Sequence, residues 1–321
     1  MVEPELETFK TSIDLRAYAA GLGYTWDRKE SWRGSTVMRS PDGDKIIIKR
    51  DADGHYVYFS VHRESDSGSI VDFIQHRRRL SLGAVRKELR AWSGTQVSSR
   101  PAFPALPKTG KDRMGVESQF VRMLEARRHP YLENDRSLPA PLLEDPRFAG
   151  RIRTDSKGNA VFPHFNREGL CGYEIKNRGF TGFASGGTKG LWSSHEEDGD
   201  TRLVVCESAI DALSHAALFP APGTRYASIG GQMNPLQPEL VRAAAARMPV
   251  GSEIVAAMDA DTEGRKLADV VRQAVELSGR SDLRFSVHEP VGFKDWNDQL
   301  RGKPIASLPY RPIEGLGPSI K

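Results

Sequence analysis

Arg-Leu-Val-Val-Cys-Glu at residues 202–207 and Ile-Val-Ala-Ala-Met-Asp at residues 254–259 are two short apolar runs that each end on a carboxylate. Asp211 and Asp261 follow within a few positions. Apolar runs of this length, each followed by a helical pattern, are typical of buried parallel strands. Open α/β sheets bind ligands at the carboxyl ends of such strands. Because gathered carboxylates repel one another, a cation is needed to keep them ionised, so the stretch predicts a Mg2+ site.

The pattern of strand and helix repeats through residues 201–303. Two further apolar runs, at 226–229 and 283–287, complete a set of four predicted strands. Helical patterns at 209–218, 238–248 and 265–277 alternate with them. The prediction is an α/β domain with a compact parallel sheet, since strands that alternate with helices form parallel sheets.

The composition is that of a soluble globular protein, with 38% hydrophobic and 27% charged residues and a negative mean hydropathy. No apolar run approaches the roughly 20 residues that a membrane span requires, and the first residues do not form a secretory signal. The two cysteines, Cys171 and Cys206, lie in apolar surroundings and are predicted to be buried thiols. We therefore expect a cytoplasmic protein without a membrane partner.

The basic residues are concentrated at the N-terminal end. Residues 1–113 hold 20 Lys and Arg against 15 Asp and Glu, whereas the remainder holds 26 against 27. This excess is compatible with a nucleic-acid partner. The expected organisation is a small α+β domain at 1–93, a linker at 94–112, a second small α+β domain at 113–200, the sheet domain at 201–303 and a tail at 304–321.

Within the first domain we expect a helix at 12–23, three antiparallel strands near 35–38, 45–49 and 55–61, and two helices between 68 and 92. A further helix is expected at 116–128. The proline-rich region at 138–148 cannot be one long helix.

The run Gly68-Ser-Ile-Val-Asp-Phe-Ile74, followed by basic residues and Leu-Ser-Leu-Gly-Ala-Val at 80–85, resembles the end of the CHC2-type zinc finger domain of bacterial primases. That family holds zinc with Cys and His side chains. No cysteine precedes Cys171 here, so the resemblance is to a degenerate finger, and no zinc is expected. His55 and His62 remain, and the basic run at 76–79 could contact phosphate or form a solvated helix face.

Residues 160–178, with Val-Phe-Pro at 161–163 and Gly-Tyr-Glu-Ile-Lys-Asn-Arg at 172–178, resemble the N-terminal subdomain of the primase catalytic core. In that family basic side chains of this subdomain face template and nucleotides. The resemblance implies phosphate contacts for Lys176, Arg178 and Lys189. The glycine-rich run at 184–190 lacks the spacing of a P-loop.

Four separated motifs, at 207–212, 228–231, 259–266 and 294–298, resemble in their order the Toprim domain of bacterial primases, topoisomerases and some nucleases. The resemblance implies that Glu207, Asp259 and Asp261 are catalytic and that Mg2+ or Mn2+ is bound. The residues assigned to the metal are Glu207, Asp211, Asp259, Asp261 and Asp295, and those assigned to nucleic acid or nucleotide within these motifs are Arg265 and Lys294.

Asn297 stands where bacterial primases have a second aspartate, which leaves open whether one or two metal ions bind. The leading interpretation is a primase-like enzyme that joins ribonucleotides on single-stranded DNA during plasmid or mobile-element replication or conjugative transfer, with a helicase or relaxase as partner. One alternative is a metal-dependent nuclease. The other is an inactive DNA-binding or recruitment module.

Overall fold

The computed structural model describes residues 4–32, 34–51, 53–61, 66–94, 101–108 and 110–303. It divides into two compact units, which are described separately. The first contains residues 1–120 and 174–188, and the second contains residues 121–173 and 189–321. His62 and the tail at 304–321 lie outside the described residues.

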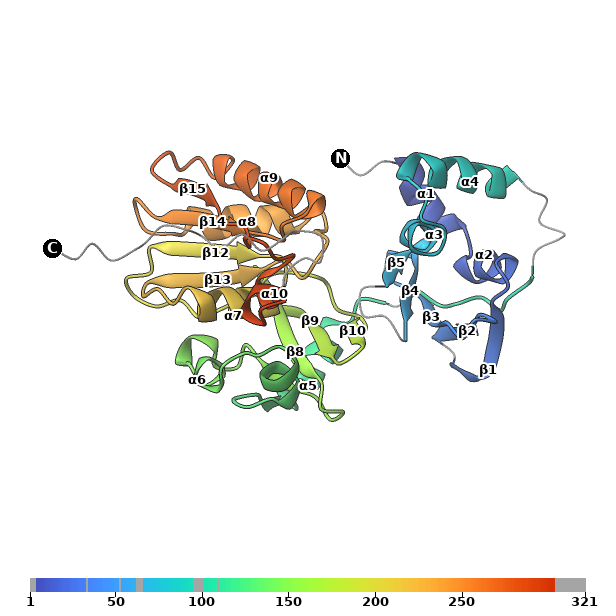
Figure 1. The fold of residues 1–321 in the computed structure, drawn as a ribbon, viewed down its shortest axis with the longest axis horizontal. Coiled ribbons are helices and arrows are strands. Elements are labelled where there is room, and N and C mark those ends of the chain that lie inside the picture. The colour runs from blue at the N-terminus through green and yellow to red at the C-terminus, as the bar shows by residue number, and fades with distance from the viewer. Residues whose placement is uncertain are drawn as a thin grey trace. The chain divides into compact units, whose positions relative to one another are not determined.

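An antiparallel sheet with helices forms most of the first unit (Figure 1). Its strands follow one another in sequence order: β1 (Thr25–Trp32), β2 (Ser35–Arg39), β3 (Lys45–Arg50), β4 (Tyr56–Ser60) and β5 (Ser67–Ser69). The helices are α1 (Pro4–Ser12), α2 (Leu15–Gly21), α3 (Ile70–Arg78), α4 (Leu82–Gly94) and α5 (Arg113–Val121).

Alternation along the strands produces the core of this unit. Ile46 and Ile48 on β3 and Tyr58 on β4 are buried on one face of the sheet, where they join Phe73 of α3 in one cluster. Helix α3 begins at a capping box in which Ser69 and Asp72 exchange hydrogen bonds, as its Ser-Ile-Val-Asp sequence favours.

The expected strands and helices of residues 35–92 are confirmed, whereas α1, β1 and β5 were not predicted. The helix expected at 116–128 is wrong beyond α5. That prediction relied on Val121 and Leu124 as apolar positions, but both side chains are exposed, and Leu124 pairs instead with Thr154 in a short ladder.

A second small sheet has the strand order β10-β9-β8-β7-β6. Its strands are β6 (Leu124–Glu125), β7 (Arg153–Thr154), β8 (Ala160–Asn166), β9 (Gly169–Asn177) and β10 (Phe180–Phe183), and the boundary between the two units falls within β9. Between β6 and β7 the chain forms a π-helical turn η2 (Tyr131–Asp135), α6 (Ala140–Leu143) and a 3-10 turn η3 (Pro146–Phe148), so the proline-rich region is not one helix, as expected.

The third sheet, in the second unit, is the predicted parallel sheet. Its order is β11-β13-β12-β14-β15, with β12 (Arg202–Cys206), β13 (Thr224–Ser228), β14 (Glu253–Ala257) and β15 (Arg284–Val287) parallel and the edge strand β11 (Trp192–Ser193) antiparallel. The helices are α7 (Ala209–Leu218), α8 (Gln237–Ala246), α9 (Thr262–Glu276) and α10 (Trp296–Leu300). The α/β fold class is confirmed.

Helices cover both faces of this sheet (Figure 1). Leu203 and Val205 of β12 pack with residues of α8 and α9 on one face. Val204 and Cys206 pack on the other face with α7, with Trp296 of α10 and with the segment that precedes the sheet. Burial on both faces accounts for the continuous apolar runs in the sequence.

None of the helices among the described residues combines the length and the apolar character needed to cross a bilayer.

Candidate metal centre

The register of the parallel sheet places the first two carboxylates at one edge. Cys206, the last residue of β12, pairs with Ala257, the last residue of β14. Glu207 follows directly, and Asp259 lies two residues beyond Ala257, so both leave the sheet at its carboxyl end. This is the edge that the sequence predicted for the acidic residues.

Asp211 is held inside the first turn of α7. The Ser208 hydroxyl donates a 2.5 Å hydrogen bond to Asp211 Oδ2, and the backbone N–H of Asn297 donates to Asp211 Oδ1 over 3.2 Å. The residue is only 8% exposed. Burial, with smaller contributions from the charges of Asp295 and Glu207, raises the pKa of Asp211 to about 7.

Asp259 is the most strongly perturbed carboxylate of the edge. Burial and the charges of Asp211, Glu207 and Asp295 raise its pKa to about 9, against an opposing effect of Lys294. Its Oδ1 is buried and makes no hydrogen bond to any part of the chain that the structure describes. A buried acceptor without a donor is costly unless a ligand satisfies it.

Asp261 caps helix α9, where its Oδ1 accepts a 2.8 Å hydrogen bond from the N–H of Gly264. Gly264 is required by the close approach of the backbone, because a Cβ at this position would lie 2.1 Å from the carbonyl oxygen of Asp259. The Asp-Ala-Asp-Thr-Glu-Gly sequence therefore turns the chain tightly from strand β14 into α9 and leaves both aspartates beside that turn.

Asp295, near the C-terminal end of the Toprim-like sequence motifs, also acts on the pKa values of Asp211 and Asp259. It caps α10, and burial raises its pKa. The neighbouring Asn297 is 3% exposed and donates through Nδ2 to the carbonyl of Arg136 over 2.8 Å and to the Ser214 hydroxyl over 3.0 Å. Asn297, which stands where bacterial primases have an aspartate, therefore connects α10 with α7 and with the turn that follows η2.

Arg136 was not identified from the sequence. Its positive charge acts to lower the pKa of Asp295, and its Nε donates a 2.8 Å hydrogen bond to the Tyr131 hydroxyl. Nothing in the local sequence marks it, because it follows a π-helical turn 159 residues before Asp295 and only the tertiary fold brings the two charges near each other.

The acidic side chains at this edge are of the chemical type that binds divalent cations. All are carboxylates, the ligands that Mg2+ and Mn2+ prefer, and the unpartnered oxygen of Asp259 lies among mutually repelling charges. We found no group of three or more His, Cys, Asp or Glu side chains that is arranged to hold a metal ion in this conformation. This holds for the residues that the structure describes between 4 and 303. Five residues contribute the carboxylates that could supply ligands: Glu207, Asp211, Asp259, Asp261 and Asp295.

The basic residues assigned from the sequence fall into two groups. Lys294 is exposed and close enough to act on the pKa of Asp259, while Arg265 is exposed and lies 4.0 Å from Glu289. Lys176 and Arg178 belong to the first unit, where Lys176 Nζ lies 3.6 Å from Glu174 and Arg178 is exposed.

Lys189 has a different environment from the one expected of a phosphate-binding side chain. Its Nζ donates hydrogen bonds to the carbonyls of Gly230 over 2.6 Å and of Gln232 over 3.0 Å. The loop they belong to follows β13, and Gly230 and Gly231 both have positive φ. The N–H of Gly231 donates to the carbonyl of Glu207 over 2.9 Å. Lys189 thus supports the loop that contacts the backbone of Glu207.

His55, one of the two histidines in the region whose sequence resembles a degenerate finger, is paired with acidic side chains. His55 forms ion pairs with Glu7 and, over 3.2 Å, with Asp51, and these contacts raise its pKa. His62 lies outside the described residues.

Comparisons with known proteins give two family matches. Residues 130–200 match a protein family of unknown function, DUF3991, and residues 204–300 match the Toprim-like family. No curated protein matches the sequence.

The solved structures that show distant likeness include the following three. The primase fragment of the bacteriophage T7 primase–helicase protein is 16% identical over 80% of this chain and 90% of its own, with a TM-score of 0.37. A T7 lagging-strand DNA polymerase complex with primase domains of gp4 gives 19% identity over 52% and 83%, with a TM-score of 0.36. A DNA primase domain from Pseudomonas aeruginosa gives 15% over 49% and 50%, with a TM-score of 0.32.

The region of the parallel sheet and its four motifs coincides with the Toprim-like match, because residues 204–300 run from β12 through α10. All five carboxylates of the candidate metal centre lie inside it. The chain therefore carries a Toprim-like region at residues 204–300, as the ordered motifs indicated.

Proposed function

We propose that this chain is a metal-dependent nucleotidyltransferase of the primase type, which joins ribonucleotides on a single-stranded DNA template. The observation that carries the proposal is the buried Asp259 carboxylate, whose Oδ1 lacks a hydrogen-bond donor and whose pKa is raised to about 9 by burial and by neighbouring carboxylates. It lies at the carboxyl edge of the sheet in the Toprim-like region. A site built this way favours a cation as its partner.

In this proposal Asp259 and Asp261 hold Mg2+ or Mn2+, with Glu207, Asp211 and Asp295 completing the donor set. The cation, when bound, supplies positive charge to the phosphate that is attacked and to the leaving group. Glu207 accepts the proton of the attacking 3′-hydroxyl, which bonds to the α-phosphorus as pyrophosphate departs.

The surrounding residues have supporting roles. Lys294 and Arg136 offset the negative charge of the edge, as their effects on the pKa values of Asp259 and Asp295 indicate. Ser208 and Asn297 fix both oxygens of Asp211, so that this carboxylate needs little reorganisation when a cation arrives.

Single-stranded DNA is the proposed template. The excess of basic residues in 1–113 and the basic side chains Lys176 and Arg178 of the first unit support this assignment. A helicase or a relaxase is the proposed protein partner, in the replication or conjugative transfer of a plasmid or other mobile element. Each of these assignments extends the Toprim-like match rather than following from it.

The test is a primer-synthesis assay. The purified full chain is incubated with single-stranded DNA, labelled ribonucleotides and Mg2+ or Mn2+, and short labelled products are expected. Asp259→Asn should abolish them. Asp269→Asn is the matched control, because Asp269 is an exposed acid on α9 whose side chain is 64% accessible, and this variant should retain full activity.

The same assay separates the alternatives. Shortened template without labelled products, lost in Asp259→Asn, would replace the primase proposal with a nuclease. DNA binding that Asp259→Asn and Asp261→Asn leave unchanged, without any product, would indicate an inactive binding module. Absence of divalent-ion binding at millimolar concentration would exclude both enzymes.

A further inference from the structure

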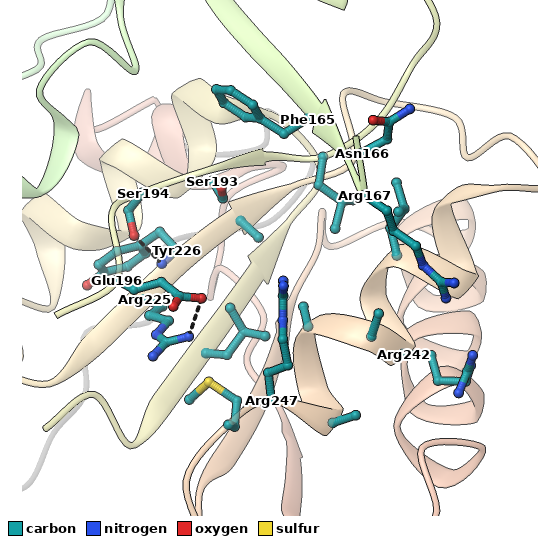
Figure 2. A pocket seen from close by; sticks show the side chains of 18 residues that line it. Phe165, Asn166, Arg167, Ser193, Ser194, Glu196, Arg225, Tyr226, Arg242 and Arg247 are labelled. Carbon is teal, nitrogen blue, oxygen red and sulfur yellow. Dashed lines mark hydrogen bonds and ion pairs between the residues drawn. The ribbon is translucent and has the colours of Figure 1, made fainter. Parts of the chain in front are cut away.

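A cavity of about 470 Å3 lies in the second unit on the face of the parallel sheet that α8 covers (Figure 2). Its walls come from β11, β12 and β13, from the C-terminal half of α8 and from the turn between β8 and β9. The volume falls in the range of about 300–1,000 Å3 that is typical of small-molecule sites. A smaller cavity of about 290 Å3 adjoins it and shares Asn166, Arg167 and Leu240.

The cavity is separate from the carboxylate edge. It is lined by Leu203 and Arg225, which pair with each other near the beginnings of β12 and β13. Glu207 follows the other end of β12, four residues further along. At a rise of about 3.3 Å per residue this spacing corresponds to roughly 13 Å along the strand. An occupant of the cavity would therefore not occupy the proposed metal site.

The floor of the cavity is apolar. Leu203 and Ala227 of the sheet and Leu240 of α8 line it, together with Leu191 and Met248. These side chains also belong to the buried cluster under α8 and α9, so they are held in place by packing. Such a floor favours an apolar or aromatic portion of a ligand.

The rim is positively charged. Four arginines line the cavity, against one acidic residue, Glu196. Arg225 is engaged by Glu196 over 2.7 Å and by Asp200 over 3.1 Å, and Arg242 by Glu239 over 2.8 Å.

The remaining two arginines have no acidic partner. Arg167 and Arg247 are exposed, and neither side chain forms an ion pair or hydrogen bond with any residue in the described part of the chain. In Figure 2 the guanidinium of Arg247 extends from the end of α8 into the space enclosed by the lining side chains, and Arg167 lies beside α8. They provide two free positive charges from two different elements.

The end of α8 would ordinarily oppose an anion, because carbonyls at a helix C-terminus carry partial negative charge. Here Arg280 offsets part of this charge, because it binds the carbonyl of Ala246, the last residue of α8, and two carbonyls of the turn that follows. Its Nη1 donates to the carbonyls of Ala246 and Met248, each over 2.9 Å, and its Nη2 donates to that of Pro249 over 3.2 Å. The guanidinium of Arg280 therefore adds positive charge at this end of α8.

We propose that this cavity binds a small organic phosphate, with the phosphate on Arg167 and Arg247 and the apolar or heteroaromatic part on the floor formed by Leu203, Leu240 and Met248. A phosphate monoester carries about −1.5 to −2 charge at pH 7. This charge matches two free guanidinium groups better than the single charge of a ligand with one carboxylate would. This second site is independent of the carboxylate edge and of the proposed priming reaction.

The test uses adenosine 5′-monophosphate as the probe and isothermal titration calorimetry on the full chain, in buffer without divalent cations. Saturable binding is expected. Arg247→Gln and Arg167→Gln should each weaken it at least about tenfold, since each removes a charge-assisted contact. Ala243→Trp should abolish it by filling the cavity. Arg272→Gln, which removes an exposed arginine of α9 outside the cavity, should have no effect, and Asp259→Asn should bind the probe as the wild type does.

Several outcomes would overturn the proposal. They are absence of saturable binding at millimolar probe, equal affinity in Arg247→Gln, and loss of binding in Asp259→Asn, which would place the probe at the carboxylate edge. Adenosine binding as tightly as its monophosphate would remove the role of the arginines. Inorganic phosphate binding equally well would remove the role of the apolar floor. Because the probe assay needs neither metal nor template, it can succeed where the primer assay fails.

Discussion

His215 is a buried histidine that the fold keeps neutral. It is 1% exposed, its ring packs at 4.9 Å from the Trp296 ring, and its Nε2 lies 3.0 Å from Nδ1 of His288. Burial, followed by the charges of His288 and Arg202, lowers its pKa to about 3. Protonation in the folded state is therefore strongly disfavoured, while the unfolded chain takes up a proton near pH 6.5.

We predict that His215 makes the protein acid-sensitive. Above pH 6.5 both states are neutral and His215 contributes no pH dependence; below it only the unfolded state binds the proton, so stability is lost as the pH falls toward 3. Relative to His215→Phe, the wild type should lose about 1.6 kcal/mol of unfolding free energy between pH 6.5 and 5. Urea unfolding of both proteins across this range measures the difference in unfolding free energy. The carboxylates of the acidic edge, whose raised pKa values oppose the effect of His215, are present in both proteins, so their contribution cancels in the difference. A constant difference would contradict the prediction.

Lys189 gives a second prediction at this scale. Because its ammonium group binds the carbonyls of Gly230 and Gln232, Lys189→Met should lower the unfolding free energy by about 1.5–3 kcal/mol. Primer synthesis should fall with it, since the loop contacts the backbone of Glu207. Arg178→Met is the comparison: this residue is exposed in the first unit, and its loss should change stability little. If Lys189→Met weakens only DNA binding, the lysine is a phosphate contact after all.

At the scale of elements, a buried charge network joins α3 to the sheet of the first unit. Arg77 forms ion pairs with Asp44 over 2.7 Å and with Asp66 over 2.6 Å, and its Nε donates to the Tyr24 hydroxyl over 2.8 Å. Tyr58 donates to Asp66 over 2.6 Å. These contacts connect the loops before β3 and β5 with the end of α3, in a region with no cysteine to hold a metal.

We predict that Arg77→Met destabilises the first unit by about 3–5 kcal/mol, because the two buried carboxylates of Asp44 and Asp66 would lose the guanidinium group that pairs with both. Hydrogen exchange of amides in α3 and β4 reports on this unit separately from the second. Arg90→Gln is the control, since Arg90 pairs with Glu5 at the exposed surface, and it should leave exchange almost unchanged. Equal exchange in the two variants would show that the network contributes little.

Local signals were sufficient for the parallel sheet. The apolar runs of β12 and β14 and the carboxylates that follow them specify both the element and its edge, because strands buried on both faces need uninterrupted apolar residues. Local apolar spacing also predicted a helix that continues to residue 128, whereas α5 ends at Val121. Val121 and Leu124 continue a helical spacing, yet the pairing of Leu124 with Thr154 overrides the local preference, and that partner lies 30 residues away in the chain.

The candidate site was predictable where its residues adjoin strands and not where they arrive from elsewhere. Glu207 and Asp259 follow from position alone. Arg136, the binding of Lys189 to a loop carbonyl, and the arginines around the cavity depend on contacts between segments tens of residues apart. Such contacts leave no periodicity or spacing in the sequence.

For the whole molecule, the acidic edge implies a conflict between stability and function. Glu207, Asp211, Asp259 and Asp295 raise one another's pKa values or that of a neighbour, so the metal-free protein holds repelling, partly buried carboxylates that cost free energy. Ligand-binding sites commonly lower the stability of the folded protein in this way. A bound cation would convert the repulsion into attraction and stabilise only the folded state.

Asp259→Asn should therefore be more stable than the wild type without divalent ions, because it removes a buried carboxyl group whose ionised form is disfavoured by burial and by the neighbouring carboxylates, yet it should gain much less from added metal. Wild-type stability should rise by about 2.7 kcal/mol when Mg2+ or Mn2+ is present at a hundred times its dissociation constant. Thermal unfolding with chelator and with each metal measures both effects, and Asp269→Asn should behave as the wild type. Equal stabilisation of Asp259→Asn and wild type by the metal would place the cation elsewhere, and the carboxylates would then be a structural feature of the sheet edge rather than a catalytic one.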